Sequence, residues 1–228
     1  MGSINQLALI RNHYDVFLPP FLEVGSKAYD DVARVSSLFP EGKEFVGVDM
    51  QDGENVDYVI DLTKPFSEVD EAIGGKRFKS IFCLSVMEHC DNPFLMADNL
   101  SKLLKDDGIL YVSVPHSWKF HGYPSDYWRV TQEGVKKLFP DLNFDDQEMW
   151  ISTDLEGDIR PLKGSDLGRV RFKGSFFRKQ GKYISALAVG LARFFALVFS
   201  SKIVSHRYFT PPVMIDMIGR KQTATTTE

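Results

Sequence analysis

The chain has 228 residues, of which 43% are hydrophobic and 25% are charged, and this balance excludes a disordered or collagen-like protein. Lysine and arginine number 27 against 31 acidic residues, so the net charge is −4 and no nucleic acid partner is expected. Two cysteines, Cys83 and Cys90, are too few for a disulfide framework or a four-thiolate zinc site and are expected in the core. A cytoplasmic location is therefore expected, and Arg11 and Asp15 interrupt any secretory signal.

Five apolar segments predict buried strands, and segments with helical spacing separate most of them. The strands are expected at residues 21–25, 45–49, 58–61, 78–85 and 109–114. The helices are expected at residues 30–38, 92–105 and 131–139. This order predicts an α/β fold with a mostly parallel sheet between two layers of helices. Only residues 50–57 join the second and third strands, which is short for a parallel crossover.

The pattern changes after residue 143. Residues 144–152 and 213–219 predict two further strands that pair as an antiparallel edge. We expect one domain over residues 1–228, with an insertion at about 153–208 between these strands. The insertion begins with a basic stretch, in which residues 160–182 hold eight lysines and arginines against one acid.

The insertion continues with an almost wholly apolar run, residues 183–199. This run is short and contains Arg193, so it does not predict a membrane span. We expect a helix that covers the sheet or forms a homodimer face. The alternative is a peripheral contact of residues 160–204 with an anionic membrane.

Polar side chains stand at the ends of four predicted strands, namely Glu23, Asp49, Asp61 and Ser85. Because ligands of open parallel sheets bind at the carboxyl ends of the strands, these side chains predict a ligand site. A nicotinamide cofactor would need a glycine-rich diphosphate loop, whereas the first loop has only Gly25. S-adenosylmethionine (SAM) has no phosphate, and its ribose diol, adenine amine and cationic end suit carboxylates and carbonyl groups.

Six segments in order resemble the class I SAM-dependent methyltransferases, in particular the methyltransferase type 11-like family. The segments are LEVGS (22–26), FVGVDM (45–50), DYVIDL (57–62), CLSVMEHCDNPF (83–94), LLKDDGILYVSVP (103–115) and HGYPSDYWRVTQEGVKKLF (121–139). The resemblance covers roughly residues 20–140. It implies a Rossmann-like sheet of seven strands, mostly parallel, whose last strand runs antiparallel, and it implies SAM as the cofactor.

The resemblance also implies which residues hold the cofactor. They are Glu23, Gly25, Ser26, Asp49, Met50, Asp61, Leu62, Ser85, Val86, Glu88 and His89. Asp49 would accept hydrogen bonds from both ribose hydroxyls. Asp61 would accept a hydrogen bond from the adenine amine, and Leu62 would lie beside the adenine ring. Glu23 and Gly25 would hold the methionine end. The family's later glycines are replaced here by Lys27 and Tyr29, so the methionine pocket departs from the family pattern.

Ser85 and Val86 would line the methionine moiety, and Glu88 and His89 would cover it. Each acidic residue also has a structural interpretation: Asp49 and Asp61 as turn residues, and Glu88 as an acid in the first turn of a helix. His89 is equally interpreted as a structural histidine. The occurrence of three acids at three strand ends favours the ligand site over these separate explanations.

The loop after the fifth strand holds the candidates for a general base, which are His121, His116 and Asp126. We expect this aromatic-rich loop to form a wall of the acceptor pocket; the alternative is a packed lid in which Arg129 pairs with Asp126. His89, His116 and His121 do not follow any known ligand spacing, so no metal is expected.

These observations predict an enzyme that moves a methyl group from SAM to a small acceptor. The resemblance implies a hydroxyl of a sugar or of a glycan precursor, including a lipid-linked one. The alternative is a catalytically silent SAM-binding or scaffolding module that acts through the basic and apolar insertion.

Overall fold

The computed structural model describes residues 3–28, 34–40, 44–122, 124–163, 167, 170–171, 174–179, 181–198, 208–209 and 212–222. The chain forms two compact units. The first contains residues 1–162 and 212–228, and the second contains residues 163–211. The second unit starts about ten residues after the predicted start of the insertion, because β7 (Ile159–Pro161) still belongs to the first unit.

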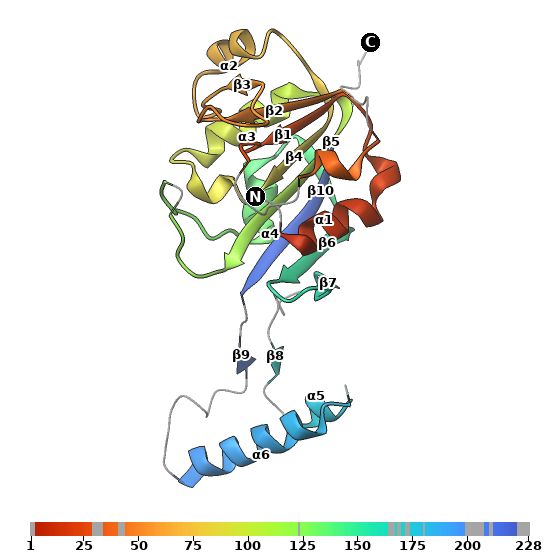
Figure 1. Cartoon of the computed structure of the whole chain (residues 1–228), viewed down its shortest axis with the longest axis vertical. Coiled ribbons are helices and arrows are strands. Elements are labelled where there is room, and N and C mark those ends of the chain that lie inside the picture. Colours follow the sequence, from red (N-terminus) through yellow and green to blue (C-terminus); the bar gives the residue numbers. More distant parts are fainter. Residues whose placement is uncertain are drawn as a thin grey trace. The chain divides into compact units, whose positions relative to one another are not determined.

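The first unit is built on a sheet of eight strands in the order β3-β2-β1-β4-β5-β10-β6-β7 (Figure 1). The strands are β1 (Phe21–Val24), β2 (Phe45–Asp49), β3 (Tyr58–Val59), β4 (Phe78–Leu84), β5 (Leu104–Ser117), β6 (Leu142–Thr153), β7 (Ile159–Pro161) and β10 (Val213–Lys221). The first five strands are parallel to one another. β10 lies between β5 and β6 and is antiparallel to both, which confirms the predicted reversal of the last strand.

Two details of the sheet differ from the sequence-based expectation. β10 and β6 pair as predicted, but they do not form the edge, because β7 adds an antiparallel eighth strand outside β6. A segment of three residues, Ile159–Pro161, carries too little apolar pattern to be recognised as a strand. Its place follows from its pairing with Trp150, Ile151 and Ser152 of β6.

The short link between β2 and β3 is possible because it folds tightly over Gly47. The Gly47 amide donates to the Asp57 carboxylate at 2.7 Å, and the Asp57 amide donates back to the Gly47 carbonyl at 2.9 Å. A Cβ at position 47 would lie 2.1 Å from the Asn55 carbonyl oxygen, so only glycine lets the link approach this closely. A compact loop thereby replaces the usual crossover helix.

Helices and short 3-10 turns cover the sheet. They are α1 (Ile4–Asn12), η1 (Tyr14–Val16), η2 (Ser36–Leu38), α2 (Phe66–Ala72), η3 (Met87–His89), α3 (Pro93–Leu103) and α4 (Gln132–Leu138). The predicted helix at 30–38 appears only as η2, and residues 30–33 lie outside the described residues. The helices expected at 92–105 and 131–139 are α3 and α4, with Asn92 and Thr131 as their N-caps.

The core lies on both faces of the sheet because the central strands are apolar without alternation. On one face, Phe21, Phe82 and Tyr111 pack with residues of α1 in a single cluster. Neighbouring strand residues such as Leu22 and Ile81 are fully buried and point to the opposite face. α2, α3 and α4 form one connected layer, since α3 contacts both of the others.

The N-terminal helix α1 was not predicted, and its position matters for the site. A capping box between Ser3 and Gln6 begins the helix. Asn5 fixes it to the turn between β6 and β7 by donating to the carbonyls of Thr153 and Leu155, both at 2.8 Å, and accepting from the Gly157 amide at 2.8 Å. α1 therefore lies against β6 with its first turn at the rim of the sheet (Figure 1).

The second unit contains β8 (Val170–Arg171), α5 (Gly174–Lys179), α6 (Tyr183–Val198) and β9 (Tyr208–Phe209). β8 and β9 pair as an antiparallel ribbon, and α5 contacts α6. The apolar run at 183–199 is thus a helix, as predicted, although Phe199 lies outside the described residues. Among the described residues, no helix is both long and apolar enough to cross a membrane.

Candidate functional site

A cavity of about 390 Å³ lies at the carboxyl ends of β1, β2 and β4. Its wall is made by these strand ends, by the loops that follow β2, β3, β4 and β5, and by the first turn of α1. The lining residues are Ser3, Gln6, Val24, Gly25, Val48, Asp49, Met50, Gln51, Ile60, Asp61, Leu62, Thr63, Ser85, Val86, Glu88, His89, Cys90, Met96, Pro115, Trp118, His121, Pro124 and Met214. This is where an open parallel sheet is expected to bind a ligand.

Asp49 presents its carboxylate at the end of β2. Its Oδ2 accepts from the Lys27 amide at 3.3 Å, and its Oδ1 accepts from the Gln51 amide at 3.0 Å. Each carboxylate oxygen can accept a second hydrogen bond. Asp49 can therefore accept from two neighbouring hydroxyl groups of a ligand while the backbone keeps its orientation fixed.

Asp61 and Leu62 form a second polar and apolar pair, after β3. The Asp61 Oδ1 accepts from the amide and the hydroxyl of Thr63, at 2.9 and 2.6 Å. Burial raises the pKa of Asp61, but these hydrogen bonds and nearby Lys64 outweigh it, so its pKa lies below the ordinary value. Asp61 is therefore an ionised acceptor at neutral pH.

Asn99 of α3 binds the loop that carries Asp61 and Leu62. The buried Asn99 amide donates to the carbonyls of Leu62 and Lys64, both at 2.8 Å. The position of one cavity wall therefore depends on one buried asparagine.

Gly25 and Ser85 mark two tight approaches at the centre of the cavity. Gly25 has φ +71°, and a Cβ there would lie 2.6 Å from the Val86 side chain. Ser85 follows β4 with φ +53°, an unusual conformation for a residue other than glycine. Gln6 of α1 donates to the hydroxyls of Ser85 at 3.1 Å and of Ser113 at 2.6 Å, and so supports this conformation.

Hydrogen bonds join the loop after β5 to the segment that follows β4. The Tyr127 amide donates to the Glu88 carbonyl at 2.7 Å, and the Trp128 indole donates to the Cys90 carbonyl at 2.8 Å. The His89 Nδ1 lies 2.6 Å from the Ser125 carbonyl oxygen. Trp118, His121 and Pro124 thereby become part of the cavity wall.

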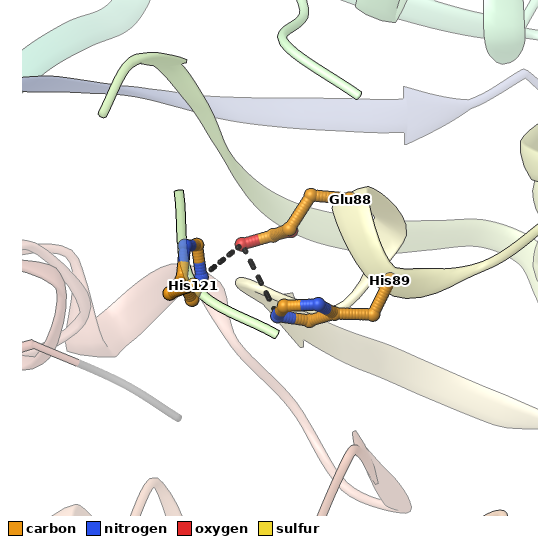
Figure 2. Close-up of side chains that lie close together, drawn as sticks. All are labelled: Glu88, His89 and His121. Atoms are coloured by element: carbon orange, nitrogen blue, oxygen red, sulfur yellow. Dashed lines mark ion pairs between the residues drawn. The ribbon is translucent and has the colours of Figure 1, made fainter. Parts of the chain in front are cut away.

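Glu88, His89 and His121 meet at this wall (Figure 2). The Nε2 atoms of both histidines lie 3.9 Å from the Glu88 Oε1, and the two rings are 4.9 Å apart and nearly perpendicular. The Glu88 side chain is 1% exposed, and burial raises its pKa to about 7. Burial also lowers the pKa of His89.

Asp126 contacts the His121 member of this cluster. Its carboxylate binds the Arg129 guanidinium at 2.5 and 2.7 Å and accepts from the His121 amide at 2.9 Å. The hydrogen bond from Arg129 holds the pKa of Asp126 well below its usual range. Because Asp126 also lies 3.2 Å from the His121 Nδ1, it orients the imidazole. A carboxylate held this way is a poor general base.

Nine of the eleven predicted cofactor residues line the cavity, and two do not. Glu23 is turned to the Val35 amide at 3.2 Å, because alternation in β1 places it on the same face as Phe21. Burial there raises the pKa of Glu23. Ser26 is buried beside Gly47, outside the lining.

Of the three predicted general bases, only His121 lines the cavity. His116 turns its Nδ1 toward the Val130 carbonyl at 3.3 Å, and Asp126 is occupied by Arg129. Tyr29, which replaces a family glycine, lies outside the described residues.

Several lining residues were not predicted from the sequence, among them Ser3, Gln6 and Met214, whereas Trp118 lies in the loop that was expected to form a wall of the pocket. Ser3 and Gln6 were detectable only as a helix start, since the S-x-x-Q spacing is that of a capping box. Met214 is the second residue of β10, which reaches the cavity because it inserts between β5 and β6. These contributions depend on strand order and not on local sequence.

No protein-family model and no curated protein sequence matches the chain. Solved structures do match. A SAM-dependent methyltransferase from Archaeoglobus fulgidus has a TM-score of 0.52 at 15% identity, over 96% of this chain and 95% of that one. The YcgJ protein of Bacillus subtilis has a TM-score of 0.50 at 13% identity, over 96% and 98% of the two chains.

A third structure, coclaurine N-methyltransferase bound to N-methylheliamine and S-adenosylhomocysteine, has a TM-score of 0.50 at 13% identity. It covers 96% of this chain and 72% of that chain. Identities this low show a shared fold and not a shared substrate. The predicted fold class, a Rossmann-like methyltransferase sheet, is confirmed.

Proposed function

We propose that this chain, which has the fold of the class I SAM-dependent methyltransferases, binds SAM and transfers its methyl group to a small acceptor. The observation that carries the proposal is the division of one cavity into two ends. Asp49 and Asp61 follow β2 and β3, on one side of β1 in the strand order, whereas Glu88, His89 and His121 follow β4 and β5, on the other side, and all five line the cavity. The first end suits a nucleoside, and the second suits the polar group of an acceptor.

We place the ribose of SAM at Asp49, whose carboxylate accepts hydrogen bonds from both hydroxyls. The adenine then lies beside Leu62, with its amine at Asp61. The methionine moiety then extends along Gly25, Ser85 and Val86 toward the cluster. A diphosphate would need a backbone cradle, and the loop after β1 turns its Lys27 amide to Asp49 instead. The charges and the loop therefore favour SAM over a dinucleotide.

The proposed reaction is an in-line displacement at the methyl carbon. A lone pair on the acceptor oxygen forms the new bond to carbon while the carbon–sulfur bond breaks. The electron pair of that bond stays on sulfur, which becomes the neutral thioether of S-adenosylhomocysteine, and the hydroxyl proton is released. The protein contributes mainly by aligning the three atoms, which can supply several kcal/mol.

We propose that the acceptor is a hydroxyl of a sugar or of a glycan precursor. Two imidazole rings and a carboxylate at the reacting end accept hydrogen bonds and suit a hydroxyl, which donates one. Trp118 supplies an aromatic wall next to them, and such a surface suits the CH groups of a sugar ring. His121 is the catalytic candidate, and Asp126 is its positioning residue.

Calorimetry with SAM, S-adenosylhomocysteine and NADH tests the cofactor. Heat with the first two and none with NADH is expected, and no heat with either adenosyl compound would overturn the proposal. A methyl-release assay against sugars, amines and carboxylic acids tests the acceptor. His121→Gln should lower turnover with the accepted compound and leave S-adenosylhomocysteine affinity nearly unchanged. Binding without methyl release from any acceptor would support the alternative of a silent SAM-binding module.

We also propose that α6 contacts an anionic membrane surface. Its exposed apolar side chains are Tyr183, Ile184, Leu187, Leu191, Phe194 and Phe195, at 51–87% exposure. Exposed Arg178 and Lys182 precede the helix, and a basic stretch beside an apolar face complements anionic lipid.

Vesicle co-sedimentation of the full chain tests the membrane contact. Binding to vesicles containing phosphatidylserine, and weaker binding to phosphatidylcholine alone, is expected. Leu187→Glu should reduce binding, whereas Leu155→Glu, at an equally exposed leucine of the first unit, should not. A stable dimer in light scattering without vesicle binding would show that the apolar face joins two copies instead.

A further inference from the structure

When Glu88 is ionised, three hydrogen-bond acceptors converge at one end of the cavity, and no donor lies among them. Neither carboxylate oxygen of Glu88 has a hydrogen-bond partner among the described residues, although the side chain is 1% exposed. Buried carboxylates are normally hydrogen-bonded, and a buried charge is normally paired. Glu88 therefore needs an occupant of opposite character.

The histidine tautomers follow from their outer contacts. The His89 Nδ1 lies 2.6 Å from the Ser125 carbonyl, and a carbonyl only accepts, so this nitrogen carries the proton. The His121 Nδ1 lies 3.2 Å from both the Asp126 carboxylate and the Lys119 carbonyl, which are also acceptors. In the neutral rings, both Nε2 atoms consequently present lone pairs to Glu88 (Figure 2).

The ionised form of Glu88 also makes the local charge negative. The charge of Arg129 lowers the pKa of Glu88, but Asp126 binds this guanidinium through both terminal nitrogens. The charges of Arg129 and Asp126 compensate each other, so this pair does not compensate the negative charge of ionised Glu88. A cation placed between the three groups would compensate that charge and satisfy all three lone pairs at once.

The spacing suits a metal ion. The three ligand atoms lie within 4.8 Å of one another, and the two histidines are 3.9 Å from Glu88. A metal about 2.1 Å from each ligand needs ligands about 3.0–3.5 Å apart. Side-chain rotation would complete the site if each histidine–glutamate pair closed by about 0.4–0.9 Å and the two histidines by up to about 1.8 Å.

We propose that Glu88, His89 and His121 bind a divalent first-row transition metal ion, with zinc as the representative. Two imidazoles and one carboxylate are the ligand set of such ions, whereas magnesium and calcium prefer oxygen alone. The contacts of the two Nδ1 atoms with Ser125 and Asp126 are those of an outer shell that orients metal-bound histidines. Three protein ligands leave a coordination position open toward the cavity.

This inference deepens the proposed methyl transfer and rests on it for the role of the ion. A bound ion would hold the acceptor oxygen in line with the methyl group and lower the pKa of its hydroxyl. The oxygen then bonds to the methyl carbon, the carbon–sulfur electron pair returns to sulfur, and the proton leaves to solvent water. His121 acts in this arrangement as a ligand and not as the base.

Metal uptake by the full chain tests the site directly. The purified protein is stripped with a chelator and titrated with Zn²⁺ by calorimetry, and Co²⁺ is followed by its visible absorption. One equivalent of either ion is expected. His89→Gln and His121→Gln should each weaken uptake at least tenfold, and His116→Gln, the matched histidine outside the cluster, should leave it unchanged.

The outcomes separate this inference from the proposed function. Circular dichroism of each variant shows whether it folds, and S-adenosylhomocysteine calorimetry shows whether the nucleoside end is intact. Absence of stoichiometric uptake by the wild-type chain overturns the metal site, as does undiminished uptake by the folded His89→Gln and His121→Gln variants. If S-adenosylhomocysteine still binds, the proposed methyl transfer survives that result. If metal binds but no adenosyl compound does, the proposed function fails and the metal site stands.

Discussion

Replacing Asp49 by alanine tests the assignment of the nucleoside end most directly. The carboxylate has one backbone donor on each oxygen, so its free lone pairs are available to two ribose hydroxyls. Hydrogen bonds to a charged group contribute about 1.5–3 kcal/mol net. Because the released hydroxyls return to water, we expect a total loss in this range, which corresponds to about 10- to 150-fold weaker binding.

Calorimetry with two ligands locates the lost contact. S-adenosylhomocysteine and methylthioadenosine share the ribose and the adenine, but only the first has the amino acid end. Asp49→Ala should weaken both by the same factor, and Asp52→Ala, at an exposed acid outside the cavity lining, should weaken neither. Thermal unfolding checks that the loop after β2 survives the loss of its backbone acceptor. Unchanged affinity, or a loss confined to S-adenosylhomocysteine, would refute the ribose assignment.

Three further changes probe the cavity walls and the core. Gly25→Ala should weaken S-adenosylhomocysteine binding at least tenfold in calorimetry, because the added Cβ meets Val86 at 2.6 Å; Gly75→Ala has a similar positive φ and no described neighbour within 4 Å, so it should cost only about 1–2 kcal/mol of stability. Equal affinity losses in both variants would contradict this explanation. Asn99→Ala should lower the free energy of unfolding by about 1–3 kcal/mol and also weaken binding, because two carbonyls of the Asp61 loop lose their donor, whereas Asn92→Ala removes only the cap of α3 and should leave affinity intact. An affinity unchanged by Asn99→Ala would show that the loop does not need this anchor. Burial raises the pKa of Asp216, despite hydrogen bonds from Ser113, Ser152 and Tyr111, so its ionisation destabilises the folded state. The stability of the wild type relative to Asp216→Asn should therefore be highest below the unfolded pKa of about 4 and fall as pH rises through the folded pKa. Urea unfolding over a pH series measures the difference, and a difference independent of pH would count against the raised pKa.

The parallel core of the sheet and the meeting of two carboxylates at one cavity were predictable from the sequence. Apolar strands without alternation can only be buried on both faces, and the carboxyl ends of parallel strands share one edge. Asp49 and Asp61 follow two such strands, so their meeting at one cavity needed no further information. The alternation of side chains along β1 also places Glu23 on the same face of the sheet as Phe21, so its position could have been predicted from the sequence.

Long-range contacts decided the remainder. β7 has three residues, and its strand conformation exists through its pairing with β6. The first turn of α1 reaches the cavity because Asn5 ties the helix to a turn about 150 residues later. Neither contact leaves a periodic pattern in the sequence, since each depends on a few hydrogen bonds between distant segments.

The cluster of Glu88, His89 and His121 also depends on long-range contacts that the sequence does not reveal. Glu88 and His89 are adjacent in sequence, but His121 joins them only because the loop after β5 is fastened across the cavity through Ser125, Tyr127 and Trp128. The sequence by itself determined that carboxylates gather at the ends of the parallel strands, because the chain direction of each strand fixes where it ends. Only the tertiary structure decided which histidine faces Glu88, because that choice depends on side-chain directions in a loop without regular secondary structure.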